Sequence, residues 1–200
     1  MAVHPDERRT NNRLSVLLDE AAKQFASKGY RGTTMRAISK NINMLPGSVY
    51  YHFKSKEALL LAVYEVGVKT ITDTVNEAID SQKAPWDKLE AAVTAHLKGV
   101  LDKNNYARII INILPSEVED LEEKLTKLRD KYEDIFVTLI NELPLNNEVN
   151  RTMFRLMLLG AINWAQVWYR PDTENPEKIA TTFIHFMRNS ADNKLNERNK

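Results

Sequence analysis

Apolar residues recur at alternating spacings of three and four along most of the chain, and this periodicity limits the fold more than any other feature. It is clearest in residues 116–142, where an apolar stripe runs from Val118 to Leu139. Such a period places apolar side chains on one face of an α-helix, whereas a half-buried strand alternates apolar and polar residues. Alternation of that kind does not persist anywhere in the chain. The sequence therefore predicts an all-α protein with about nine helices, over residues 7–28, 34–41, 46–52, 55–80, 86–103, 106–114, 116–142, 148–169 and 176–189.

Several helix ends can be predicted from residue types. Gly29 follows the first helix and suits a left-handed cap, because glycine has no Cβ that clashes at positive φ. Thr33 or Thr34 is expected to cap the second helix, since a threonine oxygen can accept a bond from a free N–H of the first turn. Ser55 and Ser116 are expected to cap the fourth and seventh helices in the same way.

The charge of the chain is unevenly distributed although the net charge is only +1. Residues 1–56 contain ten Lys and Arg against four Asp and Glu, a net charge of +6, and the remaining residues carry 18 basic and 23 acidic side chains, a net charge of −5. A basic head on an acidic body is the distribution expected if only the head contacts phosphates. The competing interpretation is a chance fluctuation on a helical surface.

The composition excludes several classes of site and location. The chain has no cysteine, which removes disulfides and thiolate chemistry and suits a reducing cytoplasm. The first ten residues are polar, so no secretion signal is expected. The longest uncharged run, residues 156–169, has 14 residues, whereas a bilayer span needs roughly 20. We therefore expect a cytoplasmic protein with no membrane partner.

Residues 29–60 contain two short predicted helices joined by a tight turn, the pattern of a helix-turn-helix. Asn43 lies in the turn and tolerates positive φ. Pro46, Gly47 and Ser48 open the second of these helices, and none has a long side chain that would hold the backbone away from DNA. This helix can therefore bring its first turn close to base edges.

The residues that follow divide into anchors and contacts. Val49 and Phe53 are the apolar residues expected to pin the second helix to the rest of the head. Tyr50, Tyr51 and His52 carry hydroxyl and imidazole groups that can reach phosphates or base edges. The competing interpretation is that the two tyrosines are core aromatics.

Nine residues are predicted to contact DNA: Thr34, Arg36, Pro46, Gly47, Ser48, Tyr50, Tyr51, His52 and Lys56. Lys56 adds a cation at the start of a helix, where the dipole already favours anions. Arg36 could instead be a solvated surface charge, and Thr34 could act only as a helix cap.

The same stretch resembles the TetR family of transcriptional repressors, the tetracycline-repressor type, over about residues 10–65. The matching positions are Gly29-Tyr30, Thr33-Thr34-Met35, Ala37-Ile38, Gly47, Val49-Tyr50, His52-Phe53, Ser55-Lys56-Glu57 and Leu59. The resemblance implies a homodimer that binds a palindromic operator in double-stranded DNA, with a ligand pocket in the body that weakens DNA binding when filled. It therefore predicts a helix-turn-helix DNA-binding domain over residues 1–54 and a ligand-binding and dimerisation domain over residues 55–200.

Two positions depart from the family pattern. Family members usually have alanine and glycine in the turn, where this chain has Ile42 and Asn43, and a serine or threonine as the cap where it has Leu45. A leucine cannot cap with its side chain, which costs about 0.5–2 kcal/mol relative to serine. We therefore expect the recognition helix to be less firmly ordered in the absence of DNA.

The helix predicted over residues 148–169 is apolar nearly all round in its second half, so it must be buried on more than one face. A two-fold contact with a second copy of the chain would cover the additional face. Trp168, Ile179, Phe183 and Phe186 are the residues predicted to form it. The alternative is a compact body in which this helix is central within one chain.

The apolar helices of the body form the kind of bundle that commonly holds a ligand between helices. Residues 160–171 also resemble, more weakly, the same region in TetR-type regulators of fatty-acid, sterol and other acyl-CoA catabolism. This resemblance implies a small hydrophobic effector, with an acyl-CoA thioester as the first candidate, and His96, Arg108 and Trp164 are the candidate ligand-binding residues. The competing interpretation of each of these three residues is ordinary packing or a surface charge. The alternative function is a regulator of multidrug efflux that responds to planar or cationic drugs.

Two rival functions lie outside this class. A helical enzyme would need a phosphate loop, a nucleophile elbow or a cluster of metal ligands, and none of these patterns occurs. No catalytic residue, metal or cofactor is therefore predicted. A helical interaction module without DNA would leave the basic head and its detailed motif unexplained.

Overall fold

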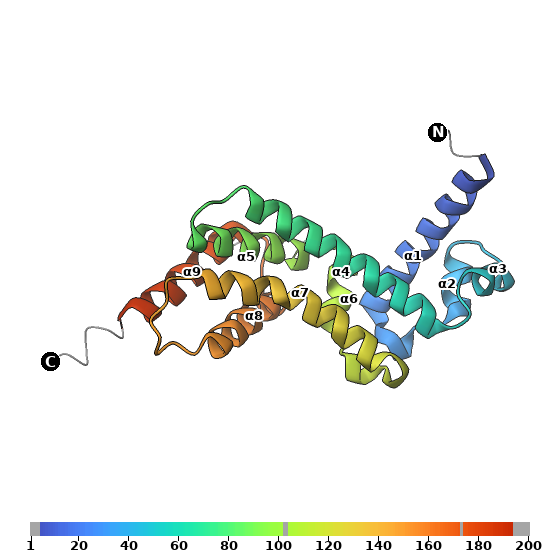
Figure 1. Cartoon of the computed structure of the whole chain (residues 1–200). Helices are drawn as coiled ribbons and strands as arrows, with labels where there is room; N and C mark the ends of the chain where they lie inside the picture. Colours follow the sequence, from blue (N-terminus) through green and yellow to red (C-terminus); the bar gives the residue numbers. More distant parts are fainter. Residues whose placement is uncertain (1–4, 102–103, 173, 194–200) are drawn as a thin grey trace. The chain divides into compact units, whose positions relative to one another are not determined.

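The computed structural model describes residues 5–101, 104–172 and 174–193, and every regular element in these ranges is helical (Figure 1). The elements are α1 (Pro5–Gly32), α2 (Met35–Asn41), α3 (Pro46–His52), α4 (Lys56–Asp80), α5 (Pro85–Leu101), α6 (Asn105–Asn112), the 3₁₀ turns η1 (Pro115–Glu117) and η2 (Glu119–Leu121), α7 (Glu122–Glu142), α8 (Arg151–Trp168) and α9 (Pro176–Asn193). The predicted all-α fold is confirmed.

The chain divides into two compact units. Unit 1 is formed by Met1–Lys69 with Asn105–Arg129, and unit 2 by Thr70–Asn104 with Asp130–Lys200. Helices α4 and α7 each contribute residues to both units. These units are defined by compactness, whereas the predicted boundary between residues 54 and 55 separates two functions. That functional division stays a prediction.

The core of unit 1 holds the helix-turn-helix in place. Helix α1 packs against α2, and α2 packs against α3. Leu17, Phe25, Ile38 and Val49 are fully buried between these helices, and burial of such side chains contributes about 1.5–3 kcal/mol each. Helix α3 has seven residues, too few to be stable alone. Its position is therefore set by tertiary packing.

Helix α6 belongs to the same unit and is held against α1 and α4. The buried hydroxyl of Tyr64 on α4 donates to the carbonyl oxygen of Ile110 at 3.4 Å. The hydroxyl of Tyr106 donates to Asp19 on α1 at 2.8 Å. A Cβ added at Gly67 would lie 2.9 Å from the carbonyl oxygen of Tyr106, so the close approach of α4 to α6 depends on glycine at that position.

Most helix ends in unit 1 agree with the sequence predictions. Gly29 has φ 69° and interrupts the helical backbone of α1, and Asn43 has φ 52° in the turn. Thr34, rather than the threonine before it, caps α2 by accepting a bond from the N–H of Ala37 at 3.1 Å. The side chain of Ser55 caps α4 in the same way. Local residue chemistry was sufficient to place these ends.

The prediction that Ser116 caps a long seventh helix is wrong. Residues 115–121 form two 3₁₀ turns, and α7 begins only at Glu122. The carboxylate of Glu117 reaches back to the N–H of Leu114 at 3.1 Å, and the N–H of Val118 bonds to the carbonyl of Pro115 at 3.1 Å. Val118 then adopts φ −131° and ψ 79°, which is not helical, while its side chain stays buried.

Unit 2 is built around α5, which packs against α8 and α9. Trp86 on α5 contacts Phe154 on α8 edge-on, with ring centroids 6.3 Å apart. Asn150 caps α8 by accepting a bond from the N–H of Met153 at 3.0 Å, so α8 begins at residue 151 and not at 148. Across the described ranges, no helix is long and apolar enough to cross a membrane.

Candidate functional site

The nine residues predicted to contact DNA all lie in unit 1, on α2, α3, the start of α4 and the cap of α2. Seven of them are exposed: Thr34, Arg36, Pro46, Gly47, Ser48, Tyr50 and Tyr51. His52 and Lys56 are half-buried. The structure therefore brings the predicted contacts together on accessible parts of the head.

Helix α3 presents one face to the core and its other side chains to solvent. Val49 is fully buried and Phe53 is half-buried, as expected of the anchors. Tyr50 is 48% exposed and Tyr51 is 76% exposed. The interpretation of the two tyrosines as core aromatics is therefore wrong. The ring of Tyr51 meets that of His52 edge-on at a centroid distance of 5.5 Å.

Lys56 joins the start of α4 to the end of α1. Its Nζ donates to the carbonyl oxygen of Tyr30 at 2.9 Å and lies 4.0 Å from the centroid of the Tyr30 ring, a cation–π contact. The hydroxyl of Tyr30 bonds to Glu57. Burial and the Glu57 carboxylate raise the pKa of Tyr30 to about 12, and the bond from Tyr30 lowers the pKa of Glu57.

Tyr30 is thus a positioning residue that the sequence predictions missed, although it stood among the matched positions of the family motif. An ammonium group has three N–H donors. The Lys56 ammonium uses one N–H for the carbonyl oxygen of Tyr30 and can therefore donate another to a phosphate.

His96, a candidate ligand-binding residue, lies in a closed polar network inside unit 2. Its Nδ1 is 2.7 Å from the hydroxyl of Tyr132, and its Nε2 is 3.0 Å from Oδ1 of Asn163. Its side chain is buried and meets the ring of Phe136 edge-on. A neutral imidazole donates from one nitrogen and accepts at the other, so both ring nitrogens are satisfied. This geometry favours the competing interpretation, a core histidine.

Burial should make stability depend on the protonation of His96. Desolvation lowers the pKa of His96 from 6.5 to about 4. An unfolded chain would bind the proton at pH values where the folded chain does not, so stability is full above about pH 6.5 and falls as the pH drops towards 4. We expect about 3 kcal/mol of destabilisation from this group over that interval. Urea unfolding at several pH values measures it.

The matched comparison is His96→Gln, which removes the titrating group. The free energy of unfolding of wild type should approach that of the variant as the pH falls from 7 to 4. A constant difference between the two proteins would show that His96 does not carry this pH dependence.

The other two candidate ligand residues lie in different surroundings. Trp164 is 64% exposed on α8 in unit 2. Arg108 is half-buried on α6 and belongs to unit 1. Each stays a prediction as a ligand contact.

Helix α8 carries an exposed apolar face. Its members recur at helical spacing and are Met153, Leu156, Met157, Trp164, Val167 and Trp168. Gly160 and Ala161, which are also exposed, lie within the same stripe. Within unit 2 one side of α8 is left uncovered, which argues against the alternative of a helix that is central within one chain.

The four residues predicted for a two-fold contact differ in accessibility. Phe186 is 65% exposed, and Trp168 is exposed and meets the half-buried Phe183 edge-on at 6.3 Å. Ile179 is only 6% exposed, because α9 turns it into the interior of unit 2, so it has little surface to offer a partner. Helical periodicity alone could not separate Ile179 from Phe186.

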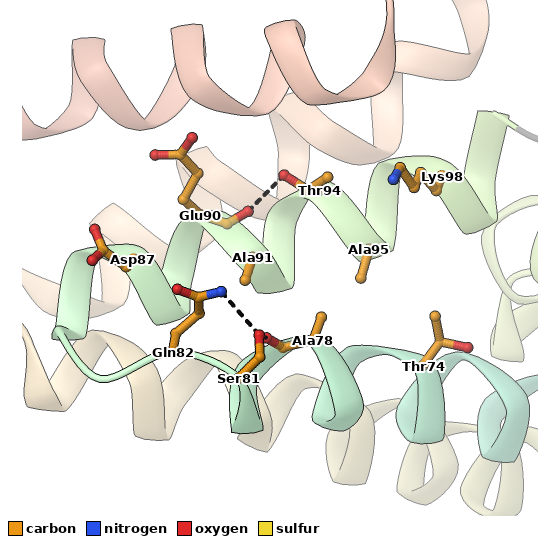
Figure 2. A pocket seen from close by; sticks show the side chains of 10 residues that line it. All are labelled: Thr74, Ala78, Ser81, Gln82, Asp87, Glu90, Ala91, Thr94, Ala95 and Lys98. Atoms are coloured by element: carbon orange, nitrogen blue, oxygen red, sulfur yellow. Dashed lines mark hydrogen bonds between the residues drawn. The ribbon is translucent and has the colours of Figure 1, made fainter.

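A groove of about 530 Å³ lies in unit 2 between the C-terminal half of α4 and α5. Figure 2 shows its two walls and the short loop that joins them. Three alanines line it, Ala78 on the α4 wall and Ala91 and Ala95 on the α5 wall, and their short side chains leave space between the two helices.

The charged residues of this groove are mostly acidic. Asp87 is exposed, and an oxygen of Glu90 accepts a bond from the hydroxyl of Thr181 at 2.6 Å. The lysine of the lining, Lys98, forms a 2.6 Å ion pair with Glu177. The groove is therefore electrostatically better suited to a cation than to an anion.

Comparison with protein families gives two matches. Residues 17–63 match the family model described as bacterial regulatory proteins of the tetR family, and residues 82–191 match a model described as a tetracyclin repressor-like C-terminal domain. Both descriptions are of regulators and neither is of an enzyme.

Curated relatives match parts of the chain. The HTH-type transcriptional repressor KstR2 of Mycobacterium tuberculosis is 30% identical over 101 residues, which are 50% of this chain and 50% of the relative. The chain thus spans about half the length of this relative. The negative transcriptional regulator IcaR of the icaADBC biofilm operon in Staphylococcus aureus is 28% identical over 131 residues, which are 59% of this chain and 68% of the relative.

Solved structures share the fold over most of the chain. The ketosteroid transcriptional regulator KstR2 of Mycobacterium tuberculosis aligns with a TM-score of 0.73 and 19% identity, covering 88% of this chain and 92% of that one. AibR in complex with isovaleryl coenzyme A and operator DNA aligns with a TM-score of 0.75 and 24% identity, covering 87% and 97%. At these identities the likeness establishes the fold alone.

Proposed function

Because the chain belongs to the TetR family of bacterial regulatory proteins, we propose that it is a cytoplasmic transcriptional repressor that binds a palindromic operator as a homodimer. A small hydrophobic effector, with an acyl-CoA as first candidate, releases it from DNA. Residues 1–54 form the DNA-binding domain, and residues 55–200 bind the effector and the second chain.

The observation that carries the proposal is the accessible surface of α2 and α3. Val49 fixes α3 from its buried side, while Pro46, Gly47 and Ser48 at its first turn are exposed and short. A recognition helix of this kind reads base edges in the major groove with its N-terminal residues. The net charge of +6 over residues 1–56 favours contact with phosphates.

The exposed apolar face of α8 supports the homodimer. Large apolar residues gathered on one helix face are rare on a monomeric surface and mark an interaction site. A two-fold contact would place the same face of a second chain against it. Trp168 lies on this face, Phe183 on α9 meets its ring, and Phe186 is exposed three residues further along α9. These three residues are the proposed contacts.

The effector is proposed from the relatives. AibR was solved in complex with isovaleryl coenzyme A, and KstR2 is described as a ketosteroid transcriptional regulator. The first of these supports an apolar acyl group on coenzyme A as the effector. Helix α4 runs without interruption from Lys56, at the candidate DNA surface, to Asp80. An effector that displaces the second half of α4 can therefore change the position of the head through one helix.

A second candidate effector class is favoured by the groove of Figure 2. Asp87 and Glu90 line it, and its lysine is already paired with a glutamate. Such a lining would attract a planar or cationic drug and repel the phosphates of coenzyme A. This candidate corresponds to a regulator of multidrug efflux.

The phosphate contacts can be tested by substitution. Lys56→Ala and Tyr50→Phe should weaken binding to specific and random duplexes alike, because phosphate contacts carry little sequence information. Each lost hydrogen bond should raise the dissociation constant about 2- to 10-fold, and Lys56→Ala should also reduce the salt slope by about one unit. Fluorescence anisotropy over a range of salt concentrations measures both.

Two further variants separate contact from folding. Lys56→Gln removes the charge but keeps an N–H donor for the carbonyl oxygen of Tyr30. It should therefore reduce the salt slope of DNA binding as Lys56→Ala does, but destabilise the fold less than Lys56→Ala. Lys131→Ala removes an exposed lysine of unit 2 and should leave DNA binding unchanged. If Lys56→Ala or Tyr50→Phe weakened binding to the specific duplex but not to random duplexes, the assignment of that residue to a phosphate would be wrong.

A further inference from the structure

Leu45 is an apolar side chain exposed at the start of the recognition helix. It occupies the N-cap of α3, makes no side-chain capping bond, and is 77% exposed. Polar residues are strongly preferred at a helix N-cap because their side chains bond to free N–H groups. A large exposed leucine at this position is not explained by the stability of the head.

The backbone around Leu45 is fixed. The carbonyl oxygen of Leu45 accepts bonds from the N–H groups of Ser48 at 2.9 Å and Val49 at 3.4 Å. The preceding N–H, of Met44, donates to the carbonyl oxygen of Ser39 at 2.9 Å. The exposure of the leucine therefore follows from an ordered turn and cap.

Leu45 also borders an apolar groove of about 550 Å³ in unit 1. Its other apolar members are Val16 on α1, which is 50% exposed, and Ile42 and Met44 in the turn, which are half-buried. Arg13, Asn43 and Ser48 are the polar residues of its lining. The patch is small and lies beside the exposed Pro46, Gly47 and Ser48.

The occupant must suit an apolar patch on a strongly basic head. Each partner in a standard protein–protein interface buries roughly 800 Å² with 20–30 residues, far more than these four side chains offer. The net charge of +6 over residues 1–56 favours a polyanion. The apolar group that the major groove of DNA presents is the C5-methyl of thymine, which apolar side chains can contact.

We infer that Leu45 is a specificity-determining residue that binds the C5-methyl group of a thymine in each half of the operator, with the groove of Val16, Ile42 and Met44 beside it. The inference rests on the proposed function, since it assigns one base within the proposed DNA contact. It predicts that the protein prefers thymine at this position because of the methyl group alone, without a hydrogen bond to the base.

The first step of the test is in vitro selection of random duplexes with the full-length chain and with Leu45→Ala. Wild type should enrich an inverted repeat with a fixed thymine in each half. Leu45→Ala should enrich the same repeat with the preference at that position lost. Because Leu45 is exposed, the alanine variant should fold.

The second step replaces the fixed thymine by deoxyuridine, which removes only the methyl group. Wild-type affinity should fall roughly 4-fold for one half-site and roughly 15-fold for both, corresponding to about 0.8 kcal/mol per methyl group. Leu45→Ala should bind thymine and deoxyuridine duplexes equally. Deoxyuridine at a different thymine of the selected site is the matched control and should have no such effect.

Leu45→Ser provides an independent readout. A serine can cap α3, so this variant should unfold at a higher temperature than wild type and still lose discrimination against deoxyuridine. A stabilised variant that discriminates as wild type does would overturn the inference, as would equal wild-type affinity for both duplexes. Failure to enrich any duplex would instead contradict the proposed function itself.

Discussion

Glutamate in place of Trp168 or Phe186 should convert the protein into monomers and weaken operator binding by at least about 100-fold. The substitution buries an unpaired charge in the proposed two-fold contact, at a cost of several kcal/mol, and symmetry introduces it twice. A monomer also loses the second head, whose binding would otherwise be intramolecular and raise overall affinity by 10²–10⁴. Since Trp168 and Phe186 are both exposed in the protomer, the fold of each chain should persist.

Sedimentation velocity gives the assembly state of these variants, and anisotropy with an operator duplex gives their affinity. Val137→Glu is the matched control, because Val137 is an apolar residue exposed on α7 outside the α8 face. Circular dichroism should show the same helix content in all the proteins. An intact dimer of Trp168→Glu and Phe186→Glu would place the interface elsewhere.

An acyl-CoA of suitable chain length should raise the operator dissociation constant by about 5- to 150-fold at saturation, the usual range of coupling between two sites. The acyl-CoA concentration needed for half-maximal release should fall as the chain lengthens, because a longer chain buries more apolar surface. A gel shift of the operator, titrated with acyl-CoAs of increasing length, measures it. Parallel titrations with free fatty acids and with free coenzyme A separate the contribution of the acyl chain from that of the coenzyme.

Reciprocity provides the control for this effect. Saturating operator must weaken acyl-CoA binding by the same factor by which acyl-CoA weakens operator binding, and calorimetry can measure both. Release by planar cationic drugs, with no response to any acyl-CoA, would contradict the acyl-CoA proposal. It would favour the groove lined by Asp87 and Glu90 as the effector site.

The features that the sequence predicted correctly depend on local chemistry. Positive φ at Gly29 and Asn43 and the cap at Thr34 follow from single residue types. The burial of Val49 beside the exposed Tyr50 follows from helical periodicity. In the same way, the residue types of the head predicted most of its helix ends.

Features that depend on contacts distant in sequence were not predicted. His96 meets Tyr132 and Asn163, which are 36 and 67 residues away, so no spacing rule identifies their network. The two 3₁₀ turns before α7 are a local feature that was also missed: the Glu117 carboxylate accepts a bond from the N–H of Leu114, three residues earlier, and this bond competes with a continuous helix from Ser116. Burial of Ile179 depends on how α9 packs against α5, and the groove between α4 and α5 depends on helix packing in unit 2.

The central claim is that two copies of this chain bind one palindromic duplex through their basic heads. Native mass spectrometry of the full-length chain with the selected duplex tests it most directly, with the intact inverted repeat compared against a duplex in which one half is scrambled. The account predicts two chains on the intact repeat, and weakened binding once one half is scrambled. One chain per intact repeat, or equal binding to the scrambled duplex, would contradict it.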